Sequence, residues 1–112
     1  MARHVVAILK RSGYISQIAR DGVEALKLIE THPYDLVSSD IEMPRMDGYE
    51  LCRRLRENPR FQALPVLALS SHADKVDRIK GFEAGFDEYL TKPVDEDIFI
   101  ATIERHLARR NP

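Results

Sequence analysis

The chain has 112 residues, of which 44% are hydrophobic and 31% charged, a balance typical of one ordinary globular domain. Seventeen Lys and Arg against 18 Asp and Glu give a net charge of −1, which argues against a nucleic-acid binder that relies on bulk positive charge. The longest apolar run covers residues 5–9, far short of the ~20 residues of a membrane helix. The first residues lack the pattern of a signal peptide, and a single cysteine, Cys52, excludes an internal disulfide. We therefore expect a cytoplasmic protein without a membrane partner.

Helices and strands alternate along the predicted chain. Apolar residues at helical spacing predict helices over 4–11, from about 22 to just before Pro33, and over 49–57, 74–84 and 95–109. Shorter apolar or alternating runs predict strands over 14–19, 34–39, 65–69 and 86–91. The run over 65–69 (PVLAL) is apolar throughout, as in a strand buried on both faces. This order predicts an α/β domain with a parallel sheet between two layers of helices.

Three residues with useful chemistry follow three predicted strands: Asp40, Ser70 and Lys92. Singly, each has an ordinary structural explanation, since Asp and Ser often cap turns or helices and most lysines are solvated. Together they lie at the carboxyl ends of parallel strands, where α/β sheets carry their sites. A carboxylate acceptor, a hydroxyl donor and a cation are the groups that a phosphoryl-transfer site needs. The sequence therefore predicts such a site at this edge.

Three segments carry a resemblance to a known family: Ser39–Leu51 (SDIEMPRMDGYEL), Pro65–Ser71 (PVLALSS) and Gly81–Pro93 (GFEAGFDEYLTKP). Over essentially its whole length the chain resembles the receiver domain of two-component response regulators. The resemblance implies the flavodoxin-like (CheY-like) doubly wound parallel sheet. It also implies a phosphorylation-dependent signalling module rather than an enzyme.

The resemblance also assigns roles to residues. It implies that Asp40 accepts a phosphoryl group from a histidine kinase, that Ser70 is the switch hydroxyl and that Lys92 pairs with the acceptor. Tyr89 is then the aromatic switch, and Pro93 follows a cis peptide bond. The implied Mg²⁺ ligands are Asp40 and the backbone carbonyl of Glu42. The implied partners are the kinase and an output domain or effector protein, which meet a face formed by residues 74–109, and no nucleic acid.

The chain departs from the family at its start. Receivers begin with a strand that ends in an acidic pair of Mg²⁺ ligands, whereas this chain opens in the segment that matches the first helix. We therefore interpret residues 1–112 as a receiver domain truncated at the N-terminus, with weak Mg²⁺ binding. Alternative strand pairing, a homodimer or strand-swapped dimer, and a fragment of a longer protein all stay open.

Two other functions compete with this interpretation. The missing acidic pair favours a receiver-like interaction module that no longer uses phosphate. A phosphatase of the haloacid dehalogenase type also places Asp, Ser or Thr, and Lys at strand ends, but the sequence has Glu42 where its second Asp would stand.

The remaining notable residues have structural explanations. We expect Phe86 to pack in the core and Cys52 to act as a small helix hydrophobe. The four histidines, at positions 4, 32, 72 and 106, show no paired spacing and are expected at the surface.

Overall fold

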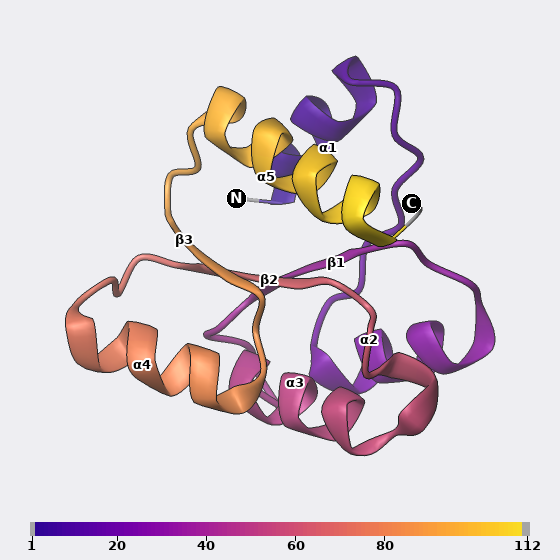
Figure 1. Cartoon of the computed structure of the whole chain (residues 1–112), viewed down its shortest axis with the longest axis vertical. Helices are drawn as coiled ribbons and strands as arrows, with labels where there is room; N and C mark the ends of the chain where they lie inside the picture. The colour runs from indigo at the N-terminus through magenta and orange to yellow at the C-terminus, as the bar shows by residue number, and fades with distance from the viewer. Residues whose placement is uncertain (1, 111–112) are drawn as a thin grey trace.

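The computed structural model describes residues 2–110 (Figure 1). Met1 and the last two residues of the predicted 1–112 domain lie outside this range. In chain order the elements are α1 (Ala2–Arg11), α2 (Gly22–Thr31), β1 (Val37–Asp40), α3 (Gly48–Glu57), the 3-10 helix η1 (Pro59–Phe61), β2 (Val66–Ser70), α4 (Lys75–Ala84), β3 (Glu88–Thr91) and α5 (Glu96–Arg110). Every predicted helix is present, with ends within about two residues of those expected.

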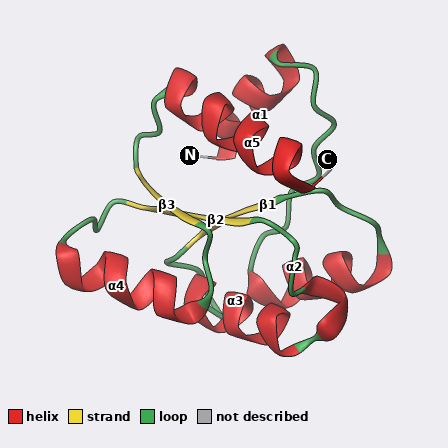
Figure 2. Ribbon diagram, viewed as in Figure 1, coloured by secondary structure: helices red, strands yellow, loops and turns green. Residues whose placement is uncertain are grey.

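The described strands form one parallel sheet with the order β1-β2-β3. Figure 2 shows the sheet edge-on between two layers of helices, with α1 and α5 on one side and α2, α3 and α4 on the other. This arrangement confirms the predicted α/β architecture, in which each crossover between parallel strands carries a helix.

The central strand β2 supplies both hydrophobic cores. Its side chains alternate between the two faces of the sheet. Val66 and Ala68 pack with α2, α3 and α4, whereas Leu67 and Leu69 pack with α1 and α5. All five residues of the strand are buried. The continuous apolar run in the sequence therefore reflects burial on both faces, as predicted.

The strand predicted over residues 14–19 is wrong. These residues carry no regular secondary structure. Ile15 is fully exposed, and Ile18 is 54% exposed. A strand requires a neighbour that pairs with its backbone groups, and within residues 2–110 no strand lies beside this segment. An alternating pattern without a pairing partner is insufficient to make a strand.

Acidic residues fix where three helices begin. Asp21, Asp47 and Asp74 precede α2, α3 and α4, and each side chain accepts a hydrogen bond of 2.8–2.9 Å from the amide three residues later. Gly85 ends α4 with φ +109°, a left-handed conformation that glycine adopts without strain.

Among residues 2–110 every helix is too short or too polar to span a membrane.

Candidate functional site

The backbone brings the three predicted site residues to one edge of the sheet. Asp40 ends β1, Ser70 ends β2, and Lys92 directly follows β3. Two main-chain hydrogen bonds join these ends, from Ile41 N–H to Leu69 O (3.1 Å) and from Lys92 N–H to Ser70 O (2.9 Å). The parallel register therefore brings these three residues to the same end of the sheet.

Asp40 and Lys92 form a direct ion pair. Lys92 Nζ lies 3.0 Å from Asp40 Oδ1. The Asp40 side chain is 38% exposed, so a partner from solvent can reach its carboxylate, whereas the lysine side chain is 20% exposed. The Lys92–Pro93 peptide bond is cis. The pair therefore presents a solvent-accessible carboxylate beside the positive charge of a mostly buried lysine.

Ser70 is fully buried and makes two hydrogen bonds through its hydroxyl. Oγ donates to Glu42 Oε1 at 3.0 Å and accepts the His72 N–H at 3.0 Å. His72 Nε2 also lies 3.4 Å from the same Glu42 oxygen. The hydroxyl predicted as a phosphoryl ligand therefore contacts Glu42 in this conformation.

Tyr89 lies inside the fold, with a side chain 4% exposed. Its hydroxyl donates to His72 O at 2.6 Å, and the Arg78 guanidinium lies 5.5 Å from the ring centre. A Cβ atom on Gly81 of α4 would lie 2.7 Å from the ring. Only glycine at this position leaves the ring its present room.

The loop between β1 and α3 is fixed at both ends. A Cβ atom on Gly48 would lie 2.5 Å from Asp40 O, so the first turn of α3 approaches the Asp40 carbonyl closely. Arg45 has φ +66°, and its guanidinium donates to Asp21 Oδ2 at 2.7 and 3.0 Å. The hydrogen bond from the Glu24 amide, with a further contribution from Arg45, lowers the pKa of Asp21.

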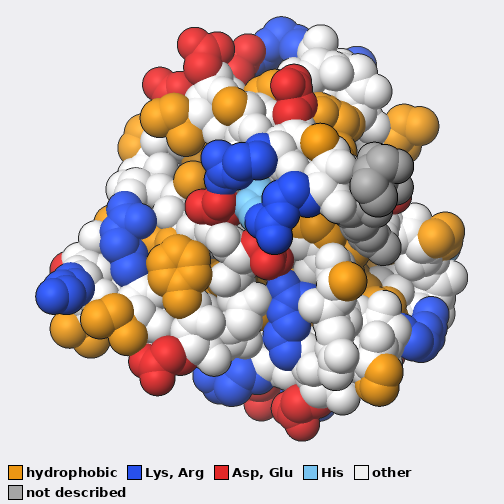
Figure 3. Space-filling model, viewed as in Figure 1, with side chains coloured by type: hydrophobic (Ala, Val, Ile, Leu, Met, Phe, Trp, Pro, Cys, Tyr) orange, Lys and Arg blue, Asp and Glu red, His pale blue; other side chains and the backbone are white. Residues whose placement is uncertain are grey.

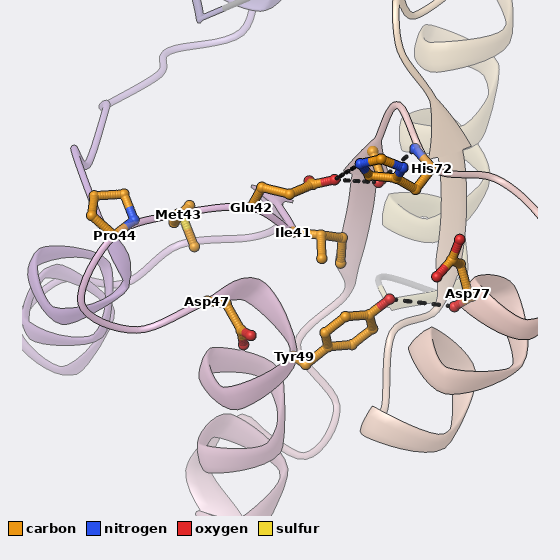
Figure 4. A pocket seen from close by; sticks show the side chains of 9 residues that line it. Ile41, Glu42, Met43, Pro44, Asp47, Tyr49, His72 and Asp77 are labelled. Atoms are coloured by element: carbon orange, nitrogen blue, oxygen red, sulfur yellow. Dashed lines mark hydrogen bonds and ion pairs between the residues drawn. The ribbon is translucent and has the colours of Figure 1, made fainter.

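An open pocket of about 490 Å³ lies beside the strand ends (Figure 4). Tyr49 lies across it from Glu42 and His72, and burial raises the pKa of its hydroxyl. Nine residues line it: Ile41, Glu42, Met43, Pro44, Asp47, Tyr49, Ser70, His72 and Asp77. The pocket shares Ser70 with the strand-end site.

The site contains hard oxygen donors of the kind that Mg²⁺ prefers. They are the exposed Asp40 carboxylate and, as the resemblance implies, the backbone carbonyl of Glu42. Among residues 2–110 no cluster of three or more His, Cys, Asp or Glu side chains could hold a metal. These two oxygens are of the type that binds Mg²⁺ in proteins, where waters usually complete the coordination of the ion.

Two polar contacts were missed at the sequence level. Nothing in the sequence indicates that the Glu42 side chain meets Ser70, 28 positions later. His106 was expected at the surface, but it is buried on α5. Its Nε2 lies 3.0 Å from Glu88 of β3, and this carboxylate satisfies the buried ring.

A comparison with protein families matches residues 1–104 to the response regulator receiver domain. The chain belongs to this family. It is 41% identical over 107 residues to the response regulator Rre1 of Synechocystis, covering 95% of this chain but 46% of Rre1. The chain therefore spans less than half of that relative's length.

Solved structures confirm the flavodoxin-like receiver fold. A putative response regulator from Chloroflexus aurantiacus superposes with a TM-score of 0.92 at 36% identity, covering 96% of this receiver domain and 88% of that chain. The receiver domain of the sensor histidine kinase PA1611 from Pseudomonas aeruginosa superposes with a TM-score of 0.88 at 28% identity, covering 96% of this chain and 88% of that one. The structure of that protein has a magnesium ion in its active-site cleft. Receiver domains are signalling modules, and the sequence resemblance identified the family correctly.

Proposed function

We propose that this receiver domain accepts a phosphoryl group on Asp40 from a phosphohistidine of a histidine kinase. In this step the P–N bond to the kinase histidine breaks and an O–P bond to the Asp40 carboxylate forms. The reachable Asp40 carboxylate, 3.0 Å from Lys92, carries the proposal. A cation fixed beside the acceptor stabilises the charge that collects on the transferring group.

The other site residues have supporting roles. Ser70, at the end of the neighbouring strand, would donate its hydroxyl proton to a phosphoryl oxygen after leaving Glu42. Mg²⁺, when bound by Asp40 and the Glu42 carbonyl, would neutralise further charge. Because the described residues form no cluster of three or more His, Cys, Asp or Glu side chains that could hold a metal, we expect weak Mg²⁺ affinity.

The output face is the surface formed by residues 74–109. Val76, Ile79 and Phe82 of α4 are 73%, 48% and 50% exposed. Figure 3 shows apolar side chains among charged ones over α4, at the lower left. Apolar side chains within a polar surround are typical of protein contacts. We propose that phosphorylation changes the packing beneath this face through Tyr89, and that the partner is an effector protein or a linked output domain in the cytoplasm.

A phosphate-independent interaction module is the second candidate. The small carboxylate set within the described part of the chain favours it. In that case partner binding would ignore both Mg²⁺ and phosphodonor. We also propose that the domain can form a homodimer, with or without exchange of strands.

Intact mass after incubation with acetyl phosphate, with and without Mg²⁺, tests the proposed function. We expect one added phosphoryl group on the parent chain and none on Asp40→Asn. Asp47→Asn is the matched control, since it loses the same charge nearby and Asn still caps α3. Equal incorporation into the parent and Asp40→Asn would exclude Asp40 as the acceptor, and no incorporation into the parent would favour the second candidate.

A further inference from the structure

The Ser70 hydroxyl has a single proton, and that proton is donated to Glu42. Oγ lies 3.0 Å from Glu42 Oε1, and its oxygen also accepts the His72 N–H. A hydroxyl donates one hydrogen bond at a time. Ser70 therefore has to leave Glu42 before it can donate to a phosphoryl oxygen.

The acceptor side of the site is held separately. Asp40 Oδ1 pairs with Lys92, while Glu42 reaches Ser70 from the loop two residues beyond Asp40. Figure 4 shows Glu42 and His72 meeting at one end of the pocket. The resting site thus keeps its cation on the acceptor and its hydroxyl on a different carboxylate.

We propose that the Glu42 side chain is a positioning residue that holds the Ser70 hydroxyl in the unphosphorylated form and competes for it with the phosphoryl group. The proposal rests on the proposed function, since the competitor is a phosphoryl group on Asp40. Glu42 thereby sets how strongly phosphorylation drives the change in Ser70.

The charges at the site favour exchange of partners. The Glu42 side chain is 45% exposed, so it can turn toward solvent. A phosphoryl group on Asp40 adds negative charge near the Glu42 carboxylate, and like charges at close range repel. The arriving group therefore both competes for the hydroxyl and weakens the contact that holds it.

The main chain of His72 connects this exchange to Tyr89. Its N–H donates to Ser70 Oγ at 3.0 Å, and its carbonyl accepts the Tyr89 hydroxyl at 2.6 Å. A movement of Ser70 toward Asp40 shifts one side of a residue whose other side anchors Tyr89. Glu42 consequently acts on the tyrosine through two hydrogen bonds.

The first test uses the unphosphorylated chain and NMR spectra of its backbone amides. We expect Glu42→Ala to shift the His72 and Ser70 amide signals, because Oγ loses its acceptor. Glu42→Gln keeps an acceptor oxygen and should restore most of the parent spectrum. Glu50→Ala is the matched control, since it removes an exposed carboxylate that pairs with Arg54. Unchanged His72 and Ser70 signals in Glu42→Ala would overturn the proposal whether or not Asp40 is phosphorylated.

The second test titrates the same variants with beryllium fluoride and Mg²⁺, a probe that imitates a phosphoryl group on a carboxylate. Loss of a hydrogen bond to a charged but half-exposed acceptor predicts half-saturation at about 3- to 10-fold lower probe concentration in Glu42→Ala. Glu42→Gln keeps the acceptor oxygen but loses the charge, so its half-saturation should lie between those of the parent and Glu42→Ala, and Glu50→Ala should match the parent. Equal half-saturation in all four chains would refute the competition. A parent chain that shows no response to the probe would contradict the proposed function and the competition that rests on it. The contact between Ser70 and Glu42 in the unphosphorylated chain is tested separately by the first experiment.

Discussion

Arg56 of α3 is the clearest place to test what holds this receiver domain together. Its side chain is 19% exposed, and its guanidinium reaches two separate segments, residues 61–64 and 85–87. The acceptors within 3.0 Å are the carbonyls of Phe61, Leu64 and Gly85 and Oδ2 of Asp87. Replacing it with Met keeps the apolar stem and removes every donor.

The expected cost follows from these contacts. Three carbonyls lose a donor in a part-buried setting, each worth about 1 kcal/mol, and the half-exposed Asp87 pair adds less than 1 kcal/mol after solvent screening. We therefore expect Arg56→Met to lower the free energy of unfolding by about 3 kcal/mol. With an m-value of about 1.5 kcal/mol/M, the urea midpoint falls by about 2 M.

Urea unfolding followed by circular dichroism measures this change. Arg54→Met is the matched control on the same helix, since Arg54 is 52% exposed and contacts Glu50 at 3.5 Å. We expect it to cost less than about 0.5 kcal/mol. Equal midpoints for the two variants would show that the carbonyl contacts of Arg56 contribute nothing net.

Three further predictions concern the site loop and the core. Gly48→Ala should lower the free energy of unfolding by about 2 kcal/mol, because the new Cβ would lie 2.5 Å from Asp40 O. A stabilisation of up to ~1 kcal/mol, the usual gain when Ala replaces Gly in a helix, would instead show that the loop moves to accommodate the methyl group. Because the native pKa of Asp21 is lowered, its contribution is present above its unfolded pKa and is lost as pH falls through the native value; Asp21→Ala should therefore flatten the acid limb of stability against pH. Cys52 is fully buried and burial raises the pKa of its thiol to about 11, so iodoacetamide at pH 8 should label it only after unfolding; rapid native labelling would contradict this packing.

Local patterns predicted the helices and the meeting of three candidate site residues at one end of the sheet. A capping carboxylate such as that of Asp21 lies three residues before the amide that it binds. The start of the helix can therefore be predicted from the sequence. Asp40, Ser70 and Lys92 were found because each follows a strand and parallel strands end at one edge.

Contacts that depend on a distant element were not predictable in this way. The segment 14–19 has the pattern of a strand, but no strand within the described residues pairs with it. Glu42 meets Ser70 only because one rotamer crosses from the loop after β1 to the end of β2. The buried His106 ring on α5 has its hydrogen-bond partner, the Glu88 carboxylate, on a different element, β3.

The position of Ser70 at the end of β2 has a consequence for hydrogen exchange. Every residue of this strand is buried and both cores pack on it, so its amides should open only in the largest unfolding events. Within residues 2–110 Asp40 lies on an outer strand of the sheet, β1, and His72 belongs to the exposed turn between β2 and α4. The hydroxyl is therefore anchored in the part of the molecule expected to exchange most slowly, while Glu42, which accepts its proton, extends from the loop after β1. Such an arrangement lets a covalent change move the turn without loosening the strand.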